Sequence, residues 1–328
     1  MYAKLSPKRG DILLAKNGTT GVAAVVDSDE IFDIYVSLAL LRPKSGVNVS
    51  YLCSALNSED LKRQFNSSLK GIGVPNLHLR EIKKARIIFP PIDIQNKISS
   101  ITKQIDKSKF LLQQILEKFE LLKKSRFIEL IGNIQNPKYQ LVELNEICEF
   151  IKDGTHQTPI YTEDRVNGFK FLSSKDVTSQ KINWSNIKYI PKELHEQLYA
   201  KLSPKRGDIL LAKNGTTGVA AVVDSDEIFD IYVSLALLRP KSGVNVSYLC
   251  SALNSEDLKR QFNSSLKGIG VPNLHLREIK KARIIFPPID IQNKISSITK
   301  QIDKSKFNVF QDQTAAQVKV IVVLHHIC

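Results

Sequence analysis

The stretch RGDILLAKNGTTGVAAVV at residues 9–26 occurs a second time, without a single change, at residues 206–223. It belongs to a longer repeat, because Tyr2 to Phe110 recur letter for letter as Tyr199 to Phe307, at an offset of 197 over 109 residues. A repeat of this length differs from the roughly 20–50-residue units of solenoid proteins. The identity indicates recent duplication or recombination, and it predicts two related structural modules in one chain.

Each copy of the repeat has the pattern of mixed strands and helices. In the first copy, the apolar runs at 12–15 and 22–26 flank a Gly-rich loop, which is typical of a hairpin or of adjacent strands. Further strands are expected at 36–41 and at 85–89. Between them, residues 50–69 have the apolar spacing of an amphipathic helix.

The segment that follows Pro90-Pro91 has the clearest structural signal in the chain. Its apolar residues fall at alternating spacings of three and four, with Lys, Glu and Gln between them. This heptad pattern predicts a helix over 93–131, roughly 58 Å long at about 1.5 Å per residue, whose narrow seam needs a partner helix. The seam positions are Ile98, Ile101, Ile105, Leu112, Ile115, Phe119 and Leu122, and the second copy restarts the pattern with Ile295, Ile298 and Ile302.

Residues 139–198 occur once and lead directly into the second copy. We expect one complete α/β domain within 133–290, with the repeat as its C-terminal part. Residues 1–91 then correspond to the C-terminal portion of the same domain without that segment. The two copies offer identical contact surfaces, so contact energy does not decide which copy the segment joins. The direct connection favours the second copy.

Two seam helices are expected, a long one at 92–132 and a shortened one at 291–307. The two copies diverge after Phe307. Residues 308–328 therefore form an atypical tail, whose apolar run at 318–327 is β-prone and would favour aggregation if it were left unburied.

The bulk composition indicates buried cores and a basic surface. The 328 residues are 42% hydrophobic and 24% charged, with a net charge of +14 and a pI near 9.5. An excess of Lys and Arg is typical of a nucleic-acid partner, because neutralised phosphates release counterions; the alternative is a solvated basic surface. The four cysteines have no zinc or disulfide spacing, and no apolar run of about 18 residues could span a bilayer. A reducing cytoplasm and no bound metal are expected.

Four short strings carry a family resemblance. Arg206 to Leu211 followed by Asn214 to Gly218 is a strand, loop and strand, and Phe286-Pro287-Pro288-Ile289, with Gln292 and Ile295, opens a helix. The loop from Lys152 to Pro159 and the strand and loop from Phe169 to Val177 are the others. In this order, over about residues 2–307, they resemble the DNA specificity subunit of type I restriction-modification systems, with a truncated first target recognition domain and an altered C-terminus.

The resemblance implies a fold and a division of labour. Members of that family hold two α/β target recognition domains apart by two antiparallel, coiled-coil-type helices. The chain would read a split target in double-stranded DNA without catalysing a reaction and without a cofactor. Methyltransferase (modification) subunits, which modify adenine, and restriction subunits would carry out methyl transfer and cleavage. One complete recognition domain would read a half-site, and two chains could pair their seam helices as a homodimer.

The residues themselves form no catalytic constellation. No GxxxxGK[ST] string occurs, and His156 beside Asp153 has no nucleophile paired with it in the sequence. Reading DNA instead needs Arg or Lys for guanine and Asn or Gln for adenine, together with contacts that fix the register on the backbone. The candidates for DNA contact are Lys152, Asp153, Thr155, His156, Gln157, Ser174, Lys175, Lys213, Asn214, Thr216, Lys267, Asn273 and His275.

Structural roles compete with several of these assignments. The loop at 152–157 can be a turn in which Asp153 or Thr155 satisfies backbone amides. Lys213-Asn214-Gly215 can be a hairpin turn, and His275 can be a helix cap or a buried histidine. Two rival functions also stand beside DNA reading. One is a recombined product that only docks the methyltransferase through residues 93–131, and the other is an unrelated basic coiled-coil protein.

Overall fold

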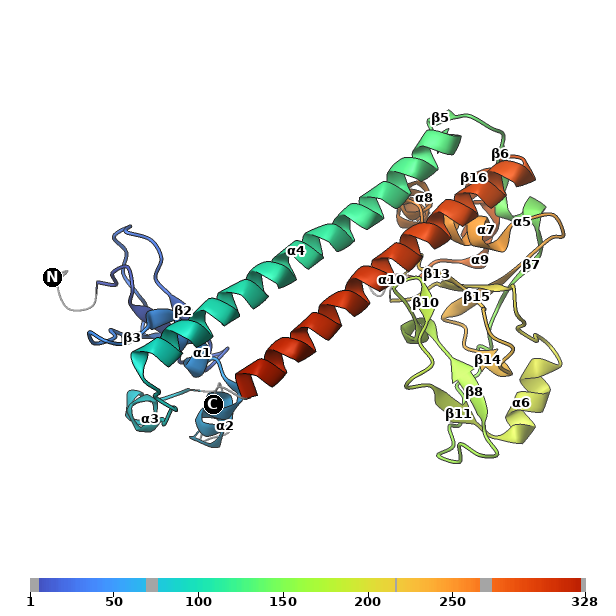
Figure 1. Ribbon diagram of the computed structural model, residues 1–328. Helices are drawn as coiled ribbons and strands as arrows, with labels where there is room; N and C mark the ends of the chain where they lie inside the picture. The colour runs from blue at the N-terminus through green and yellow to red at the C-terminus, as the bar shows by residue number, and fades with distance from the viewer. Residues whose placement is uncertain (1–5, 69–75, 216, 266–272, 326–328) are drawn as a thin grey trace. The chain divides into compact units, whose positions relative to one another are not determined.

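The computed structural model describes residues 6–68, 76–215, 217–265 and 273–325, with side chains described as far as residue 311. The chain contains two compact units, residues 1–115 with 308–328 and residues 116–307, whose elements are labelled in Figure 1. They are called the first unit and the second unit below. Each unit holds one copy of the repeated domain sequence.

A four-stranded antiparallel sheet forms the centre of the second unit. Its strand order is β13-β12-β15-β7, with β13 at Ala220–Val222, β12 at Ile209–Ala212, β15 at Leu235–Pro240 and β7 at Cys148–Asp153. The repeat supplies β13, β12 and β15. The unique segment 139–198 supplies β7, which pairs with β15 along most of that strand's length.

Both faces of this sheet are buried, which explains the uninterrupted apolar run of β12. Ile209 and Leu211 belong to one core cluster, together with Tyr248 of α7 (Val246–Leu253). Leu210 and Ala212 belong to a second cluster. Because successive side chains of a strand point to opposite faces, one short strand serves both cores.

Two further pairings join the unique segment to the repeat. β8 (Phe169–Leu172) lies between β11 (Lys188–Ile190) and β14 (Phe229–Ile231), and it runs parallel to β14. β6 (Leu141–Glu143) pairs with β16 (Arg283–Ile285). The other elements of this unit are β4 Gly132–Asn133, β5 Asn136–Pro137, α5 Leu144–Ile147, β9 Val177–Thr178, β10 Lys181–Ile182, α6 Lys192–Tyr199, α8 Glu256–Ser265 and α9 Leu276–Lys281.

Two long helices contribute to this unit. α4 spans Ile92–Ile131 and α10 spans Ile289–His325. Within the second unit, the end of α4 runs antiparallel to the start of α10 (Figure 1). An ion pair joins Lys306 to Glu120 (2.7 Å), and another joins Lys123 to Asp303. Both pairs lie across the contact between the two antiparallel helices.

The predicted seam is buried only in part within the second unit. Ile295 and Ile302 are buried, whereas Leu122 is 44% exposed. The α4 side chains that reach the domain core are Phe127, which stacks on Tyr248 with ring centroids 6.0 Å apart, and its neighbours Leu130 and Ile131. A straight α-helix drifts relative to a 3.5-residue repeat, so its packed stripe leaves the heptad positions. Of the remaining seam residues, Ile98, Ile101, Ile105, Leu112, Phe119 and Ile298 are half-buried, and Ile115 is exposed.

The first unit repeats the antiparallel sheet with three strands among its described residues. β1 (Ile12–Ala15) lies between β2 (Ala23–Val25) and β3 (Leu38–Leu41). The register is that of the second copy, since Ile12 faces Val25 and Leu41 just as Ile209 faces Val222 and Leu238. The helices that follow are α1 Val49–Leu56, α2 Glu59–Ser68 and α3 Leu79–Lys84.

Identical sequence forms strands in the second copy that it does not form in the first. Residues 229–231 and 283–285 are strands, and their counterparts at 32–34 and 86–88 have no regular structure. Ile285 is 4% exposed, whereas Ile88 is 80% exposed. Cross-strand neighbours are the main source of strand stability. The partner strands β8 and β6 therefore decide the conformation of these residues.

The fold class of α/β domains with long helices is confirmed, and the helix expected over 93–131 is α4. The strand expected at 85–89 is wrong for the first copy, because no partner strand is described there. The single helix expected at 50–69 is wrong, because Asn57 ends α1 and its amide group bonds to the backbone of Ala23 (2.8 and 2.9 Å). The β-strand tendency of the tail is not realised as far as His325, since those residues continue α10.

The two copies provide a matched stability test. We expect Ile285→Ala to lower the free energy of unfolding of the second unit by about 2–5 kcal/mol, because it leaves a cavity in a packed core. The same change at Ile88 should leave stability within about 0.5 kcal/mol, because that side chain already faces solvent. Urea denaturation followed by far-UV circular dichroism reports on the whole chain. Fluorescence of Trp184, the one tryptophan, reports on the second unit. Equal losses in both variants would contradict the difference in burial.

Candidate nucleic-acid interface

Three loops meet at one edge of the four-stranded sheet in the second unit. β7 and β12 both run antiparallel to β15, one on each side of it. The last residue of β7, Asp153, faces Ala236, and the last residue of β12, Ala212, faces Leu235. The loops after β7 and β12 and the turn before β15 therefore emerge side by side. Most of the residues predicted to contact DNA lie in or next to these loops.

A largely buried ion pair between Lys213 and Asp153 lies beneath these loops. The Lys213 Nζ atom donates to Oδ1 of Asp153, and the lysine is 4% exposed. Its backbone is fixed as well, because the amide donates to the Ser234 carbonyl (2.8 Å) and the carbonyl accepts from the Leu274 amide (3.0 Å). Lys213 thus faces Asp153 instead of the solvent, and its contact with DNA stays a prediction. A buried ammonium needs a carboxylate partner more than it needs a surface position.

The loop after β7 is held by its backbone and exposes its side chains. The Thr155 amide donates to the Ile231 carbonyl, and the Val233 amide donates to the Thr155 carbonyl (both 2.9 Å). A Cβ atom on Gly154 would lie 2.2 Å from the Ile231 carbonyl oxygen, so only glycine fits there. The Thr155 hydroxyl accepts from the Gln157 amide (3.1 Å). This confirms the turn role that the sequence allowed for Thr155.

His156, Gln157 and Thr158 are exposed in that loop. The His156 Nε2 atom lies 3.7 Å from Oδ2 of Asp153, and the side chain is 76% exposed. Lys152, the residue before Asp153, is also exposed, and its ammonium lies 5.0 Å from the ring centroid of Phe150. One cation, one imidazole and one amide group are therefore presented within six residues of chain.

Ser234, in the turn before β15, also holds the loop that follows β8. Its hydroxyl accepts from the Ser174 amide (3.0 Å), at the start of a 3₁₀ helix, Ser174–Asp176. The buried Asp176 closes this helix by accepting from the Ser173 amide (2.8 Å) and hydroxyl (3.0 Å). Lys175 lies between them and is exposed.

The remaining candidates come from the repeat. Asn214 and Asn273 form an isolated antiparallel bridge, which ties the loop after β12 to the segment before α9. The hairpin role of residues 213–215 is supported by the antiparallel pairing of β12 with β13. His275 is the N-cap residue of α9, is exposed, and makes no side-chain cap hydrogen bond within the described ranges. His275 thus occupies the cap position, but its side chain does not cap the helix. Thr216 and Lys267 lie outside the described residues.

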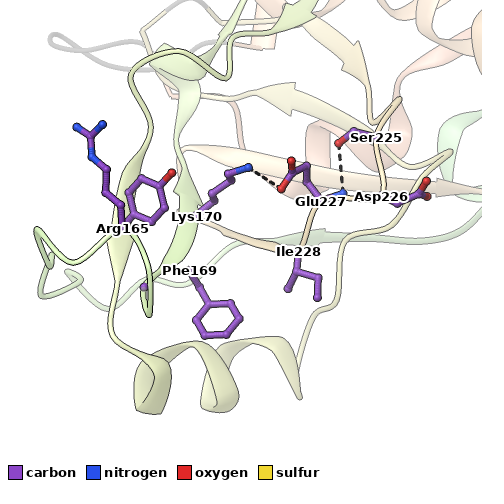
Figure 2. A pocket seen from close by; sticks show the side chains of 9 residues that line it. Arg165, Phe169, Lys170, Ser225, Asp226, Glu227 and Ile228 are labelled. Carbon is purple, nitrogen blue, oxygen red and sulfur yellow. Dashed lines mark hydrogen bonds and ion pairs between the residues drawn. The ribbon is translucent and has the colours of Figure 1, made fainter.

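A cavity beside β8 was not found by sequence reasoning (Figure 2). It has a volume of about 680 Å³ and is lined by residues from the loop before β8, from β11 and from 225–228 of the repeat. Its acidic side chains are paired: Glu227 with Lys170 (2.5 Å), and Asp226 with Arg206, which holds the pKa of that carboxyl below its usual value. Arg165 extends over the Tyr189 ring at 6.0 Å. These groups are far apart in sequence, so no local signal could have assembled them.

His195 and Asp230 form a buried contact between the unique segment and the repeat. Nδ1 of His195 lies 2.7 Å from Oδ2 of Asp230, and the imidazole stacks on Phe169 at 3.7 Å. Burial raises the pKa of the Asp230 carboxyl, and its Oδ1 atom has no hydrogen-bond partner within the described structure. The pair packs the unique segment against the repeat, and the counterpart Asp33 in the first copy is exposed.

Two buried cysteine thiols have strongly shifted pKa values. Burial raises the pKa of the Cys148 and Cys250 thiols to about 12, so both remain protonated at neutral pH. No cluster of three potential metal ligands occurs in the described part of the chain. None of the described helices is long and apolar enough to cross a membrane.

Comparison with known proteins gives a consistent result. Residues 2–121 and 136–319 match the family described as the type I restriction modification DNA specificity domain. The EcoBI specificity subunit of a type I restriction enzyme from Escherichia coli is 22% identical over 263 residues, which is 72% of this chain and 55% of that protein. A protein of Mycoplasma pneumoniae named as a type I specificity subunit is 22% identical over 260 residues, covering 76% of this chain and 63% of that protein. The chain thus spans about half to three-fifths of the length of these relatives.

Solved structures share the fold at low sequence identity. A chain from a study of complex assembly and conformational transition in the type I restriction-modification system gives a TM-score of 0.62 at 17% identity, covering 98% of this chain and 81% of that one. The type I S subunit from M. genitalium gives 0.52 at 16% identity, covering 99% and 84%. The family match continues to residue 319, beyond the end of the repeat at Phe307.

The buried ion pair allows a test of how the loop is held. We expect Asp153→Asn to destabilise the second unit by about 3 kcal/mol, because it leaves the Lys213 ammonium buried without a countercharge. Adding Lys213→Met should restore most of that loss, since the buried charge is then removed. Urea denaturation monitored by Trp184 fluorescence measures both effects. The control is Lys16→Met, the same change in the first copy, where no counterpart of Asp153 occurs in the sequence. An unchanged midpoint for Asp153→Asn alone would show that the pair does not hold the loop.

Proposed function

The chain belongs to the type I restriction-modification DNA specificity family, and on that premise we propose that it reads DNA sequence for a modification enzyme without catalysing a reaction itself. The observation that carries the proposal is the loop edge of the second unit. There a fixed backbone and a buried, neutralised ion pair present Lys152, His156, Gln157, Lys175 and His275 to solvent.

The chemistry of these side chains suits a duplex. A glutamine amide can form two hydrogen bonds to adenine, and lysine can reach guanine or a phosphate. Residues whose backbone is fixed lose little freedom on binding, which raises affinity. Contacts of their side chains to base edges would supply the specificity. The net charge of +14 favours approach to the phosphate backbone. Among the predicted residues, Asp153 and Lys213 then position the loop and do not touch bases.

The proposal extends to partners through the long helices. Modification subunits would dock on α4 and α10, and restriction subunits would join through them. The exposed seam residues Ile115 and Leu122 support this docking, because apolar side chains on a helix favour a partner surface. A homodimer through the same helices would place two complete recognition domains on one split target. The rival is a chain that docks the modification subunit but no longer directs it.

A methylome separates these functions. The chain is co-expressed with a modification subunit of this family in a host without other adenine methylation, and methylated adenines are mapped across the genome. A split motif with related halves supports reading by two equivalent domains. Co-purification of the modification subunit without any new motif supports docking alone. Absence of both outcomes would contradict the proposal and its rival.

A single lysine tests the DNA contact at the loop edge. We expect Lys175→Ala to weaken duplex binding by the full chain about equally for all sequences, and to reduce the slope of log affinity against log salt by about 1, because one phosphate contact is lost. Lys192→Ala on α6 is the control, since it removes the same charge from an exposed side chain away from the loop edge. Fluorescence anisotropy with a labelled duplex over a salt series measures both. Identical slopes for the two variants would exclude Lys175 from the interface.

A further inference from the structure

The first copy of the repeat has an open edge, and the corresponding edge of the second copy is paired with other strands. This edge consists of residues 32–36, 38–43 and 86–89. In the second copy, the counterparts of all three stretches pair with backbone from the unique segment 139–198. Because the two copies are identical in sequence, each contact in the second copy indicates a contact that the first copy can also make.

The central part of the open edge is the outer side of β3. In the second copy, β15 receives β7 along residues 236–240, and the strand reaches Pro240. In the first copy, β3 ends at Leu41 and forms the edge of its sheet. An unpaired strand edge leaves backbone donors and acceptors ready to pair with another chain.

The two flanking parts behave in the same way. Ile285 faces Leu141 of β6, and the Phe286 amide donates to the Gln140 carbonyl (2.8 Å). The Tyr232 amide donates to the Leu172 carbonyl (2.8 Å), and the Val233 amide donates to Thr155. The counterparts in the first copy are among its most exposed apolar side chains, namely Ile88, Phe89, Tyr35 and Val36.

We propose that this open edge is an acceptor for strands with the sequence of residues 139–198. The incoming segment would pair its 148–153 stretch with β3, its 141–143 stretch with residues 86–88, and its 169–172 stretch with residues 32–34. The occupant is thus identified by the register already present in the second unit. The inference rests on comparison of the two copies and does not depend on the DNA-reading function.

Within these 328 residues, the donor sequence occurs once and the acceptor sequence occurs twice. The donor is continuous with the second copy, which gives it an effective concentration in the millimolar range for that acceptor. It therefore stays with the second copy, as the structure has it. The first copy has the same intrinsic affinity for the segment and lacks only the connection.

The test co-expresses the full chain with a tagged polypeptide of residues 136–198 and measures how much full chain the tag captures. The decisive variants of the full chain are Ile88→Asp and Tyr35→Asp. Both residues are exposed at present, at 80% and 77%, so neither change should disturb the fold of the chain itself. Ile88→Asp would place a charge where the second copy buries Ile285, and Tyr35→Asp would place one where the second copy half-buries Tyr232 beside Phe171. The control is Asn66→Asp, because Asn66 and its counterpart Asn263 are both exposed.

We expect the wild-type chain and Asn66→Asp to be captured equally, with one donor per chain by native mass spectrometry. Both Ile88→Asp and Tyr35→Asp should lower capture at least tenfold. Capture that persists in both variants would show that the donor enters the second copy or binds elsewhere, and would overturn the proposal. Absence of capture with the wild-type chain would overturn it as well. This experiment measures assembly alone. A negative result would therefore not affect the DNA-reading proposal, which the methylome tests separately.

Discussion

The pairing of β7 with β15 is the interaction on which the second unit depends. It joins a segment that occurs once to a sequence that occurs twice, and it converts a three-stranded sheet into one that is buried on both faces. The same pairing brings the end of β7 beside the end of β12, where Asp153 meets Lys213. Core and candidate interface therefore arise from one strand addition. Among the described residues of the first unit, the sheet has three strands and no counterpart of β7.

The two copies show which secondary structure the repeat forms by itself and which it forms only beside strands of the unique segment. Strands β1, β2 and β3 form in both copies because their partners lie within the repeat. The stretch Arg-Ile-Ile forms a strand at 283–285 and no strand at 86–88, although every letter is the same. Apolar alternation predicts that a segment can be a strand. Whether it becomes one depends on a partner that a local pattern does not contain.

The same distinction explains which parts of the site could be predicted. α4 was predictable because a helix closes its hydrogen bonds within itself, and heptad spacing over 93–131 is a local signal. The loops at 152–157 and 213–215 were predictable from their polar and Gly-rich composition. The burial of Lys213, the stacking of His195 on Phe169 and the cavity beside β8 all join residues distant in sequence. The ion pairs of Glu120 with Lys306 and of Lys123 with Asp303 join α4 to α10 across a long separation in sequence, so the heptad pattern did not predict them.

In the loop after β7, some residues fix the backbone and others are exposed for the proposed contact with DNA. Asp153 is constrained by the buried Lys213, and Gly154 is constrained by the Ile231 carbonyl oxygen, which leaves no room for a side chain. His156 and Gln157 follow at once and are exposed, so their identities are free of both constraints. Most of the exposed candidates, including Lys152 and Lys175, also belong to the unique segment. Under the proposed function, exchanging residues 139–198 for another segment that keeps Asp153, Gly154 and the strand pairings would change the DNA sequence that is read. The repeat would supply the same frame for every such segment.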